Sequence, residues 1–319
     1  MASVDLVIPC YNYGRFLRTA VESAIEQTGV DVRVLVIDDC SADDTAEVGA
    51  TLAREYEAVR FRRHAANRGH IATYNEGIAE LTADYFLLLS ADDYLLPGAL
   101  ARATRLMDEH EDVAFVFGRA LLADDTGPSE HLVPLSRGIV RNGNTVLPAR
   151  QFVALASARN IVPTPPAVVR TSVQQAVGGY RADLPHTGDM EMWLRLATRG
   201  NVGYVDIEQA VYRLHGTNMS KGYSGLDDLV ARQKALAAFF DEGVTRIDAS
   251  GALKRDCLKR LSGEAFRSAR AALNRGDNEA AARLQDYGLE LSPTARLSTS
   301  WLKLMAKRAA RGQLLSAGY

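Results

Sequence analysis

Two stretches of the sequence, VRVLVIDD at residues 32–39 and YFLLLSADD at residues 85–93, decide the fold class. Each begins with a mostly apolar run of the kind that favours a strand covered on both faces, and each ends in two adjacent aspartates. Strands covered on both faces are typical of parallel sheets, whose crossover connections place helices on either side. We therefore predict an α/β protein with a mostly parallel sheet sandwiched by helices.

The rest of the first 120 residues alternates strand-like and helix-like segments, as such a sheet requires. Apolar and β-branched runs predict strands at residues 4–8, 32–37, 59–62, 85–89 and 113–117. Helical spacing predicts helices at residues 16–25, 43–55 and 71–81, and from Pro97 onward. We expect Pro9 to end the first strand, and Ser41 and Asp43 to cap the second helix.

The second half of the chain divides into two parts. Turn-forming residues crowd residues 123–166, and segments of this kind often cover a site. Beyond it we predict a strand at residues 167–169, a helix at 189–199 and a strand at 202–205. From about residue 222 only helical spacing follows. We therefore expect an α/β domain of residues 1–222 and a helical C-terminal region of residues 223–319.

The helical region offers two features of note. Gly276 and Asp277 separate two helical segments and predict a helical hairpin. Residues 301–311 place apolar side chains opposite basic ones, which fits either a helix docked on the protein with a solvated basic face or a helix at a membrane surface. The region is also a candidate surface for a homodimer.

Composition excludes some classes of function. The 319 residues hold 37 Lys and Arg against 39 Asp and Glu, a net charge of −2, which argues against a nucleic-acid binder that neutralises phosphates broadly. The chain begins in a strand-like run rather than a signal peptide, and its apolar runs are far shorter than the ~20 residues of a membrane span. Cys10, Cys40 and Cys257 match no metal or redox spacing, so we expect a cytoplasmic protein with reduced thiols and Cys10 and Cys40 as small packing residues.

The paired aspartates indicate a ligand site. Because the carboxyl ends of parallel strands meet at one edge of a sheet, Asp38–Asp39 and Asp92–Asp93 should converge there. Adjacent like charges are costly unless a cation or hydrogen-bond donors offset them. Helix capping is an alternative role for one such pair. Two pairs at neighbouring strand ends favour the site.

Six short motifs together resemble those of the family 2 glycosyltransferases, inverting enzymes of the GT-A fold that use nucleotide-diphosphate sugars. In chain order they are PCYN (9–12), DDCSADDT (38–45), NRG (67–69), SADD (90–93), GGY (178–180) with GDMEMWLR (188–195), and YRLHGTNMS (212–220). The resemblance covers residues 3–222, about two thirds of the chain. Each motif is weak alone, and their order and spacing carry the resemblance.

The resemblance implies a set of donor-binding residues: Pro9, Tyr11, Asp39, Asn67, Arg68 and Asp92. Tyr11 would lie near the base, and Asp39 would accept a hydrogen bond from it, characteristically from uracil. Arg68 would lie in the loop beneath the nucleotide, near the diphosphate, and Asp92 would hold the ribose. Ser90 stands where many relatives carry Asp, which would weaken ribose or metal binding if that carboxylate mattered.

The resemblance also implies a metal and a base. Asp93 would ligate Mn²⁺ or Mg²⁺, with His215 reaching the metal or the diphosphate, since hard oxygen ligands suit both ions. Asp189 would be the catalytic base at the start of a helix, where a helix N-cap is its alternative role. We expect Glu191 to be structural. Trp193 would either pack in the core or stack on an acceptor sugar.

The sequence therefore predicts a metal-dependent inverting glycosyltransferase that moves a sugar from a nucleotide-diphosphate donor, expected to be a UDP-sugar, to an acceptor hydroxyl. The acceptor stays open among a glycan, a lipid-linked glycan and a small molecule, and peripheral contact with the inner membrane face stays open too. One alternative is a degenerate nucleotide-sugar-binding protein whose helical tail is an interaction module. A sugar nucleotidyltransferase is disfavoured, because no glycine-rich basic loop follows the first strand.

Overall fold

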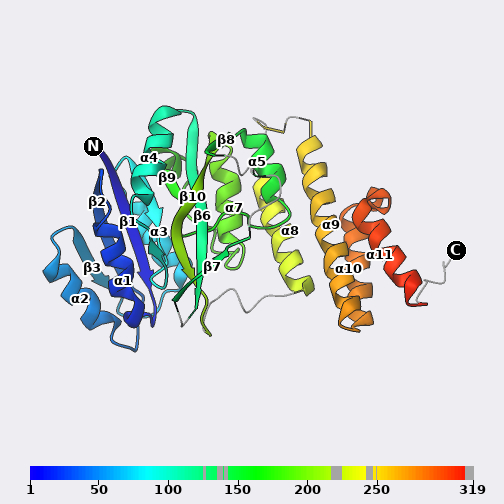
Figure 1. Ribbon diagram of the computed structural model, residues 1–319, viewed down its shortest axis with the longest axis horizontal. Helices are drawn as coiled ribbons and strands as arrows, with labels where there is room; N and C mark the ends of the chain where they lie inside the picture. The colour runs from blue at the N-terminus through cyan, green and yellow to red at the C-terminus, as the bar shows by residue number, and fades with distance from the viewer. Residues whose placement is uncertain are drawn as a thin grey trace.

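The computed structural model describes residues 1–124, 127–134, 139, 143–216, 225–241, 247–248 and 250–312 (Figure 1). The molecule is elongated, with the N-terminal sheet at one end and a set of helices at the other (Figure 1). Within the described residues, ten strands form one sheet in the order β3-β2-β1-β4-β9-β6-β10-β5, with β7 paired to β6 and β8 paired to β10.

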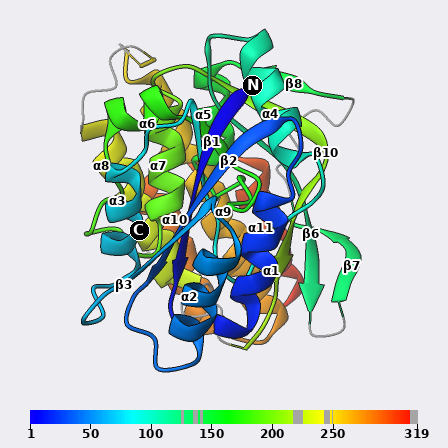
Figure 2. The same cartoon turned by 90° about the vertical axis from the view of Figure 1, so that its left-hand side faces the viewer.

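The first half of the α/β part alternates strand and helix as predicted. Its elements are β1 (Ala2–Cys10), α1 (Gly14–Ile25), β2 (Val30–Asp38), α2 (Thr45–Glu55), β3 (Val59–Arg63), α3 (His70–Ala79) and β4 (Tyr85–Leu88). The four strands are all parallel, and Figure 2 shows β1 and β2 side by side across this end of the molecule.

The expectation that Pro9 ends the first strand is wrong. Strand β1 continues through Pro9 to Cys10, and Pro9 lies opposite Ile37 of β2. The backbone N–H and C=O groups of odd-numbered residues in β1 point toward β4, because the carbonyl of Val7 accepts the amide of Leu89. The ladder with β4 stops at Val7 and Leu88, so the missing N–H of Pro9 breaks no ladder hydrogen bond.

The second half of the sheet contains the antiparallel strands. Its elements are β5 (Tyr94–Leu95), α4 (Ala99–Glu109), β6 (Val113–Asp124), β7 (Gly127–Leu132), β8 (Thr145–Leu147), α5 (Ala149–Ala156), β9 (Val168–Arg170), α6 (Thr171–Val177), α7 (Gly188–Leu196) and β10 (Asn201–Arg213). Strand β9 runs antiparallel to both β4 and β6, while β6 and β10 are parallel. Strands β1 to β4, β6 and β10 thus share one direction, which confirms the mostly parallel α/β sheet.

Two hydrophobic clusters cover the two faces of the sheet. One packs α1, α2 and α4 against strand residues such as Leu6 and Ile8. The other begins at Val7 on the opposite face and includes α3, α5 and α7. Trp193 belongs to the second cluster, is 3% exposed and stacks on Phe115 at 5.4 Å between ring centroids. Trp193 is therefore a core residue and does not contact an acceptor.

The second cluster continues without a break into the helical region. That region contains α8 (Gly225–Asp241), α9 (Ala252–Asn274), α10 (Asn278–Leu291), the 3₁₀ helix η2 (Pro293–Leu297) and α11 (Thr299–Ala310). Fully buried Phe239, Phe266 and Leu304 join the same cluster as Phe115. The boundary expected at residues 222 and 223 lies outside the described residues.

The predicted helical hairpin is present, and the last helix docks on it. Gly276 has a φ of +83° between α9 and α10, and the Asp277 carboxylate caps α10 by accepting the amide of Ala280 at 2.9 Å. The Trp301 ring of α11 lies 5.2 Å from that of Phe266 in α9. The expectation that the basic face is solvated is wrong at Arg308, which is only 7% exposed. Arg308 is buried because its side of α11 packs against the hairpin.

No helix in the described ranges combines the length and the apolar composition that crossing a membrane requires.

Candidate active site

A cavity of about 1300 Å³ opens where the parallel strands end. Pro9, at the end of β1, lines it together with Asp39 beyond β2 and Asp92 and Asp93 beyond β4. The convergence expected from the strand ends is therefore present for three of the four aspartates. Asp38 is fully buried instead and bonds the amide of Ser41 at 2.9 Å, so its role is structural.

The loops after β1 and β2 are tied together beside the cavity. The Ser41 hydroxyl accepts the amide of Asn12, and the Asn12 side chain accepts the amide of Ala42, both at 2.8 Å. Ser41 therefore does not cap α2, contrary to expectation. Asp43 is not the cap either, because the N-cap of α2 is Asp44, which makes no side-chain cap hydrogen bond. The Asp43 carboxylate, one residue earlier, accepts the amide of Thr45 at 3.1 Å.

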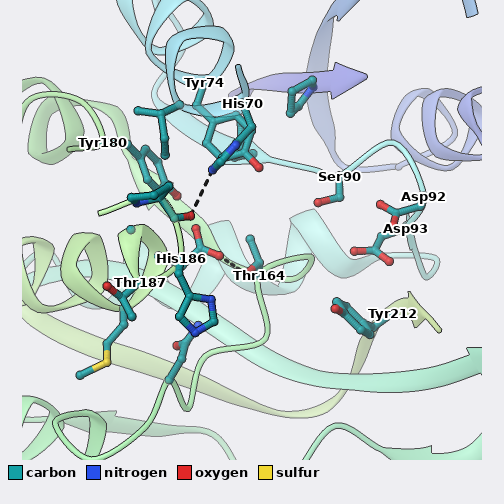
Figure 3. Close-up of a pocket in the computed structure, with 18 of the residues that line it drawn as sticks. His70, Tyr74, Ser90, Asp92, Asp93, Thr164, Tyr180, His186, Thr187 and Tyr212 are labelled. Atoms are coloured by element: carbon teal, nitrogen blue, oxygen red, sulfur yellow. Dashed lines mark hydrogen bonds between the residues drawn. The ribbon is translucent and has the colours of Figure 1, made fainter. Parts of the chain in front are cut away.

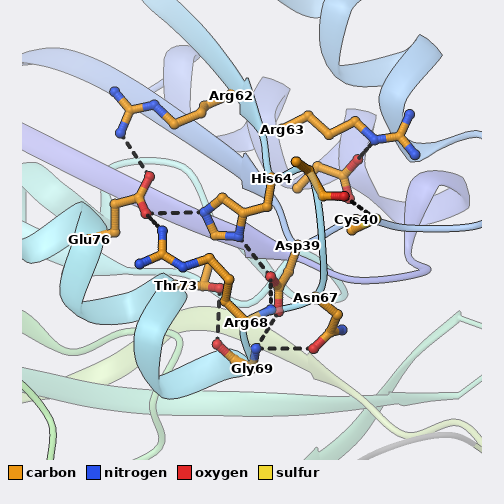
Figure 4. Close-up of polar contacts among 12 residues, drawn as sticks. Asp39, Cys40, Arg62, Arg63, His64, Asn67, Arg68, Gly69, Thr73 and Glu76 are labelled. Atoms are coloured by element: carbon orange, nitrogen blue, oxygen red, sulfur yellow. Dashed lines mark hydrogen bonds and ion pairs between the residues drawn. The ribbon is translucent and has the colours of Figure 1, made fainter.

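Asp39 is the centre of a polar network beneath the cavity (Figure 4). Its carboxylate accepts the amides of Arg68 and Gly69 at 2.8 Å each and lies 2.7 Å from Nδ1 of His64. Burial alone would raise the pKa of Asp39, but these hydrogen bonds outweigh it and hold the pKa below its usual value. Asp39 is thus a fixed, ionised acceptor at the edge of the cavity.

The loop at residues 67–69 approaches the cavity through Asn67 and Gly69. The Asn67 side chain accepts the amide of Gly69 at 3.0 Å, and both residues line the cavity. The Arg68 guanidinium instead pairs with Glu76 on α3, and Arg68 is not among the lining residues (Figure 4). Arg68 therefore contacts Asp39 through its backbone amide and not through its guanidinium.

Asp92 and Asp93 are held by the end of β10. The Asp93 carboxylate accepts the amide of Arg213 at 2.9 Å and is 2% exposed. Burial, together with the charge of Asp92, raises the pKa of Asp93. His215 Nε2 lies 2.9 Å from Oδ2 of Asp92, and the imidazole packs against the rings of Tyr13 and Phe16. The structure thus brings His215 to Asp92 and not directly to Asp93.

The donor set of this pair fits a hard divalent cation. Both carboxylates line the cavity, and their mutual repulsion is the kind that a cation relieves. The described residues contain no group of three or more potential ligands. Mg²⁺ generally takes one or two protein carboxylates and completes its shell with waters and substrate phosphates.

Asp189 lies across the cavity from the Asp92–Asp93 pair, in the first turn of α7. Its carboxylate accepts the Thr164 hydroxyl at 3.1 Å and the Tyr180 hydroxyl. Burial raises the pKa of Asp189, and the two hydroxyls offset this only in part. Figure 3 shows Thr164 between Asp92 and Asp93 on one side and His186 and Thr187 on the other. Asp189 is thus a cavity-lining carboxylate whose pKa is raised.

Residues 5–150 match the family model described as Glycosyl transferase family 2. The first half of the chain therefore has the sequence pattern of a family 2 glycosyltransferase domain. An uncharacterised protein of Mycobacterium tuberculosis is 29% identical over 216 residues, which are 66% of each chain. A glycosyltransferase of Rickettsia felis is 23% identical over 69% of this chain but only 36% of its own length. The chain thus spans between about a third and two thirds of these relatives.

One relative has a specific activity in its name. A Campylobacter jejuni protein named GalNAc(5)-diNAcBac-PP-undecaprenol beta-1,3-glucosyltransferase is 29% identical over 38% of this chain and 39% of its own.

Solved structures of the same fold match most of the chain. TarS residues 1–349 of Staphylococcus aureus, in complex with UDP-GlcNAc, matches with a TM-score of 0.60 over 89% of this chain and 90% of its own, at 13% identity. A Pyrobaculum calidifontis mannosyltransferase in complex with GDP-Man and Mn²⁺ matches with a TM-score of 0.54 over 99% of this chain and 88% of its own, at 16% identity. These likenesses show the fold of the domain.

The segment that precedes Asp189 is held from two sides. His70 Nε2 lies 3.1 Å from the carbonyl of Pro185 (Figure 3). On the other side, His186 Nε2 lies 2.9 Å from Asp228 of α8, and the Thr187 hydroxyl donates to the carbonyl of Ala231 at 3.2 Å. Sequence reasoning missed these contacts, because each side chain is an isolated polar residue with no motif around it.

The role of Glu191 agrees with the prediction that it is structural. Glu191 is fully buried and pairs with Arg195 one turn later at 2.6 Å. Arg195 in turn donates to the carbonyls of Val177 and Gly179 at 2.6 and 2.8 Å. The pair therefore fixes the loop that carries Tyr180, a partner of Asp189.

Cys10 lines the cavity but is not a nucleophile. Burial raises the pKa of the Cys10 thiol to about 12, so the thiolate is scarce at neutral pH. Its sulfur lies 3.8 Å from the Thr45 hydroxyl. Packing at the strand end, as predicted, accounts for this residue.

Proposed function

We propose that this protein is a metal-dependent, inverting glycosyltransferase that moves a sugar from a nucleotide-diphosphate donor to an acceptor hydroxyl by direct displacement. One observation carries the proposal. Asp189, a carboxylate with a raised pKa, shares a single cavity with the ionised Asp39 and the buried Asp92–Asp93 pair. A base on one side, and on the other carboxylates that can hold a cation to offset the charge of the leaving group, are what displacement at an anomeric carbon requires.

For the donor we propose a UDP-sugar. Asp39 offers carboxylate oxygens to an N–H of the base, and Tyr11, which is 49% exposed at the cavity, offers a ring for stacking. Pro9 and Asn67 line the same end, and Asp92 is placed for the ribose hydroxyls. The TarS complexes with UDP-GlcNAc and UDP support this base, whereas the GDP-Man complex of the mannosyltransferase shows that the fold also accepts guanine.

For the metal we propose Mn²⁺ or Mg²⁺ held by Asp93, with Asp92 and His215 beside it. When bound, such an ion offsets the negative charge that develops on the departing diphosphate. His215 orients the Asp92 carboxylate through the bond to its Oδ2. The amide of Arg213 fixes Asp93 in the same way, so both carboxylates are in place before a donor arrives.

In the reaction that we propose, the acceptor hydroxyl gives its proton to Asp189 while its oxygen forms a bond to the anomeric carbon. The bond from that carbon to the diphosphate oxygen breaks, and its electron pair leaves with the nucleoside diphosphate. The configuration inverts, because attack and departure occur on opposite faces. The raised pKa makes Asp189 a stronger base than an exposed aspartate. The name of the Campylobacter relative supports a lipid-linked glycan as one acceptor class.

The test is the metal-dependent release of nucleoside diphosphate from a panel of UDP- and GDP-sugars, with nucleotide binding measured on the same samples. We expect UDP release from at least one donor that stops when the metal is chelated. Binding of UDP without turnover of any donor or acceptor would favour a nucleotide-sugar-binding protein instead. If no nucleotide binds with or without metal, the proposal fails.

A further inference from the structure

The cavity extends past Asp189, away from the donor aspartates, into a chamber that we call the far end. Its polar lining consists of Arg159, Asn160, His186, Asp228, Arg232, Glu264 and Ser268. Helices α8 and α9 supply four of these residues, and Figure 1 shows both helices on the side of α7 that faces away from β1. The helical region therefore forms part of the wall of the glycosyltransferase cavity.

Charge is unevenly distributed along this cavity. The donor end is lined by Asp39, Asp92 and Asp93, whereas the arginines among the described lining residues, Arg159 and Arg232, are both at the far end. A donor diphosphate beside a metal at Asp93 does not need these arginines. They lie on the opposite side of Asp189, where a second ligand would bind.

Arg232 already bonds the protein through all three of its guanidinium nitrogens. Its Nε donates to Asp228 at 3.1 Å, its Nη2 pairs with the same carboxylate, and its Nη1 donates to the carbonyl of Ala158 at 2.9 Å. The Arg232–Asp228 pair is neutral and holds α8 against the loop after α5. It contributes no net charge to the far end.

Arg159 is in a different situation. Its Nε and Nη2 both donate to Oε1 of Glu264, at 3.0 and 2.7 Å, while its Nη1 makes no hydrogen bond to the part of the chain that the structure describes. The side chain is 47% exposed. Its guanidinium is thus oriented by Glu264 and keeps one free edge.

Glu264 does not neutralise Arg159 alone, because it serves two arginines. Arg267 donates from Nε to Oε2 of Glu264 at 2.9 Å and lies 2.5 Å from Oε1 through Nη2. Two guanidinium groups therefore share one carboxylate, and the cluster of Arg159, Arg267 and Glu264 carries an excess of one positive charge. Asn160 and Ser268 add neutral hydrogen-bonding groups beside it.

We propose that the far end is an acceptor subsite for a glycan that carries an anionic group, a phosphate or a carboxylate, and that Arg159 binds this group. The inference rests on the proposed function, since an inverting displacement brings the acceptor hydroxyl in from the side opposite the leaving diphosphate. A guanidinium with a free edge matches the planar, two-oxygen geometry of these anions. The excess charge of the cluster is offset once the anion binds.

The test compares three matched probes, methyl glucoside, glucose 6-phosphate and glucuronate, for binding to the protein saturated with UDP and Mn²⁺, by saturation-transfer NMR titration. We expect both anionic probes to bind about tenfold more tightly than the neutral one, as a charge-assisted hydrogen bond implies. If the two anionic probes differ, the tighter one identifies whether a phosphate or a carboxylate is the anion that the subsite takes. Equal affinity for all three probes would overturn the proposal.

Two arginine variants separate the subsite from the ion-pair cluster. Arg159→Gln should abolish the preference for anionic probes, and Arg159→Lys should retain part of it. Arg267→Gln is the matched control, since it removes the other guanidinium from Glu264 at a residue that does not line the cavity. It lowers the charge of the cluster but leaves the free edge of Arg159, so it should keep more of the preference than Arg159→Gln does. If Arg159→Gln still prefers the anionic probes, the assignment of Arg159 is wrong.

Measurements of the donor keep this inference distinct from the proposed function. UDP affinity and metal-dependent UDP release should be unchanged in Arg159→Gln, with a thermal unfolding midpoint close to that of the parent protein. Loss of anion preference with intact UDP release would support the subsite. Absence of UDP release and nucleotide binding in the parent protein would reject the glycosyltransferase proposal, whatever the probes show.

Discussion

At the scale of single residues, the carboxylates of the cavity differ in pKa because different groups surround them. Asp39 has two backbone amides and His64 to stabilise its charge, and its pKa is lowered. For Asp189, burial outweighs the hydroxyls of Thr164 and Tyr180 and the nearby His70, and its pKa is raised. Opposite shifts in one site are how a protein divides the roles of fixed acceptor and proton acceptor between residues of the same type.

Asp189→Asn should reduce sugar transfer by roughly 10²–10⁴-fold, because the amide cannot accept the proton of the acceptor hydroxyl. Metal-dependent UDP binding should be retained, since Asp189 lies away from the donor aspartates. Turnover and UDP affinity are measured on the same protein. Asp183→Asn, at a carboxylate that is 67% exposed, is the control and should behave like the parent. Near-normal turnover of Asp189→Asn would mean that another group is the base.

The pH dependence of turnover should report the two hydroxyls that bond Asp189. The base must be ionised, so activity falls as the pH drops through the pKa of Asp189, which lies above the usual value for an aspartate. Tyr180→Phe removes a hydrogen bond that favours the ionised form and should move this acidic limb to higher pH. Tyr56→Phe, at a hydroxyl bonded to Glu22, is the matched control. An acidic limb that does not move would separate Tyr180 from the base.

Stability should also depend on pH through Asp189. A pKa that is higher in the folded than in the unfolded protein means that folding favours the protonated acid. Ionisation of Asp189 therefore costs stability as the pH rises above the unfolded value and through the folded one. Asp189→Asn, which is always neutral, should raise the thermal unfolding midpoint at pH 7 and lose this advantage near pH 4. The reverse trend would show that the burial of Asp189 is not what raises its pKa.

At the scale of elements, the start of α7 depends on α8. Residues 185–188 carry Asp189 into the cavity, and Asp228 and Ala231 of α8 hold them through His186 and Thr187. A displacement of this segment by a fraction of an ångström would move the base relative to the reacting hydroxyl. Asp228 is thus a positioning residue for Asp189.

Asp228→Asn should lower kcat by about tenfold or more while leaving the KM for the donor nearly unchanged, because it loosens the segment before the base without touching the donor end. Steady-state kinetics with varied donor give both parameters. Asp227→Asn, at the exposed neighbouring carboxylate of the same helix, should leave both unchanged. A rise in the donor KM at constant kcat would place Asp228 in donor binding instead.

The elements show which parts of the fold could be predicted from sequence. Strands β1, β2 and β4 were predictable because buried parallel strands have continuous apolar runs. Strand β10 extends to Arg213, well beyond the predicted residues 202–205. The second half was not predictable, because Asp206, Glu208 and Gln209 interrupt the apolar pattern and the pairing with β6 decides the conformation there. The contacts of His186 with α8 depend on residues 42 positions apart, and no local pattern reports them.

At the scale of the whole molecule, the two parts of the chain share one hydrophobic core. The cluster that contains Phe115 and Trp193 under the sheet also contains Phe239, Phe266 and Leu304 of the helices. Such a core is expected to unfold as one unit, since exposing either side leaves the other unpacked.

Phe266→Ala should destabilise the protein by about 3 kcal/mol or more, because Phe266 is fully buried between α10 and α11. Thermal unfolding followed in parallel by circular dichroism and by loss of UDP binding should give one shared, lowered midpoint. Leu302→Ala, at a side chain that is 59% exposed, should leave the midpoint nearly unchanged. Two separate transitions would instead show that the helical region unfolds independently.

The shared core has a consequence for recombination among relatives. A chimera that exchanges only residues 225–312 would set foreign helices against Phe152 of α5 and Leu194 of α7, which lie in the same cluster as Phe239 and Leu261. Such grafts should express poorly unless the facing side chains of α5 and α7 travel with them. Among relatives, a change of specificity at the far end is therefore expected to need coordinated substitutions in the α/β part and in the helical region.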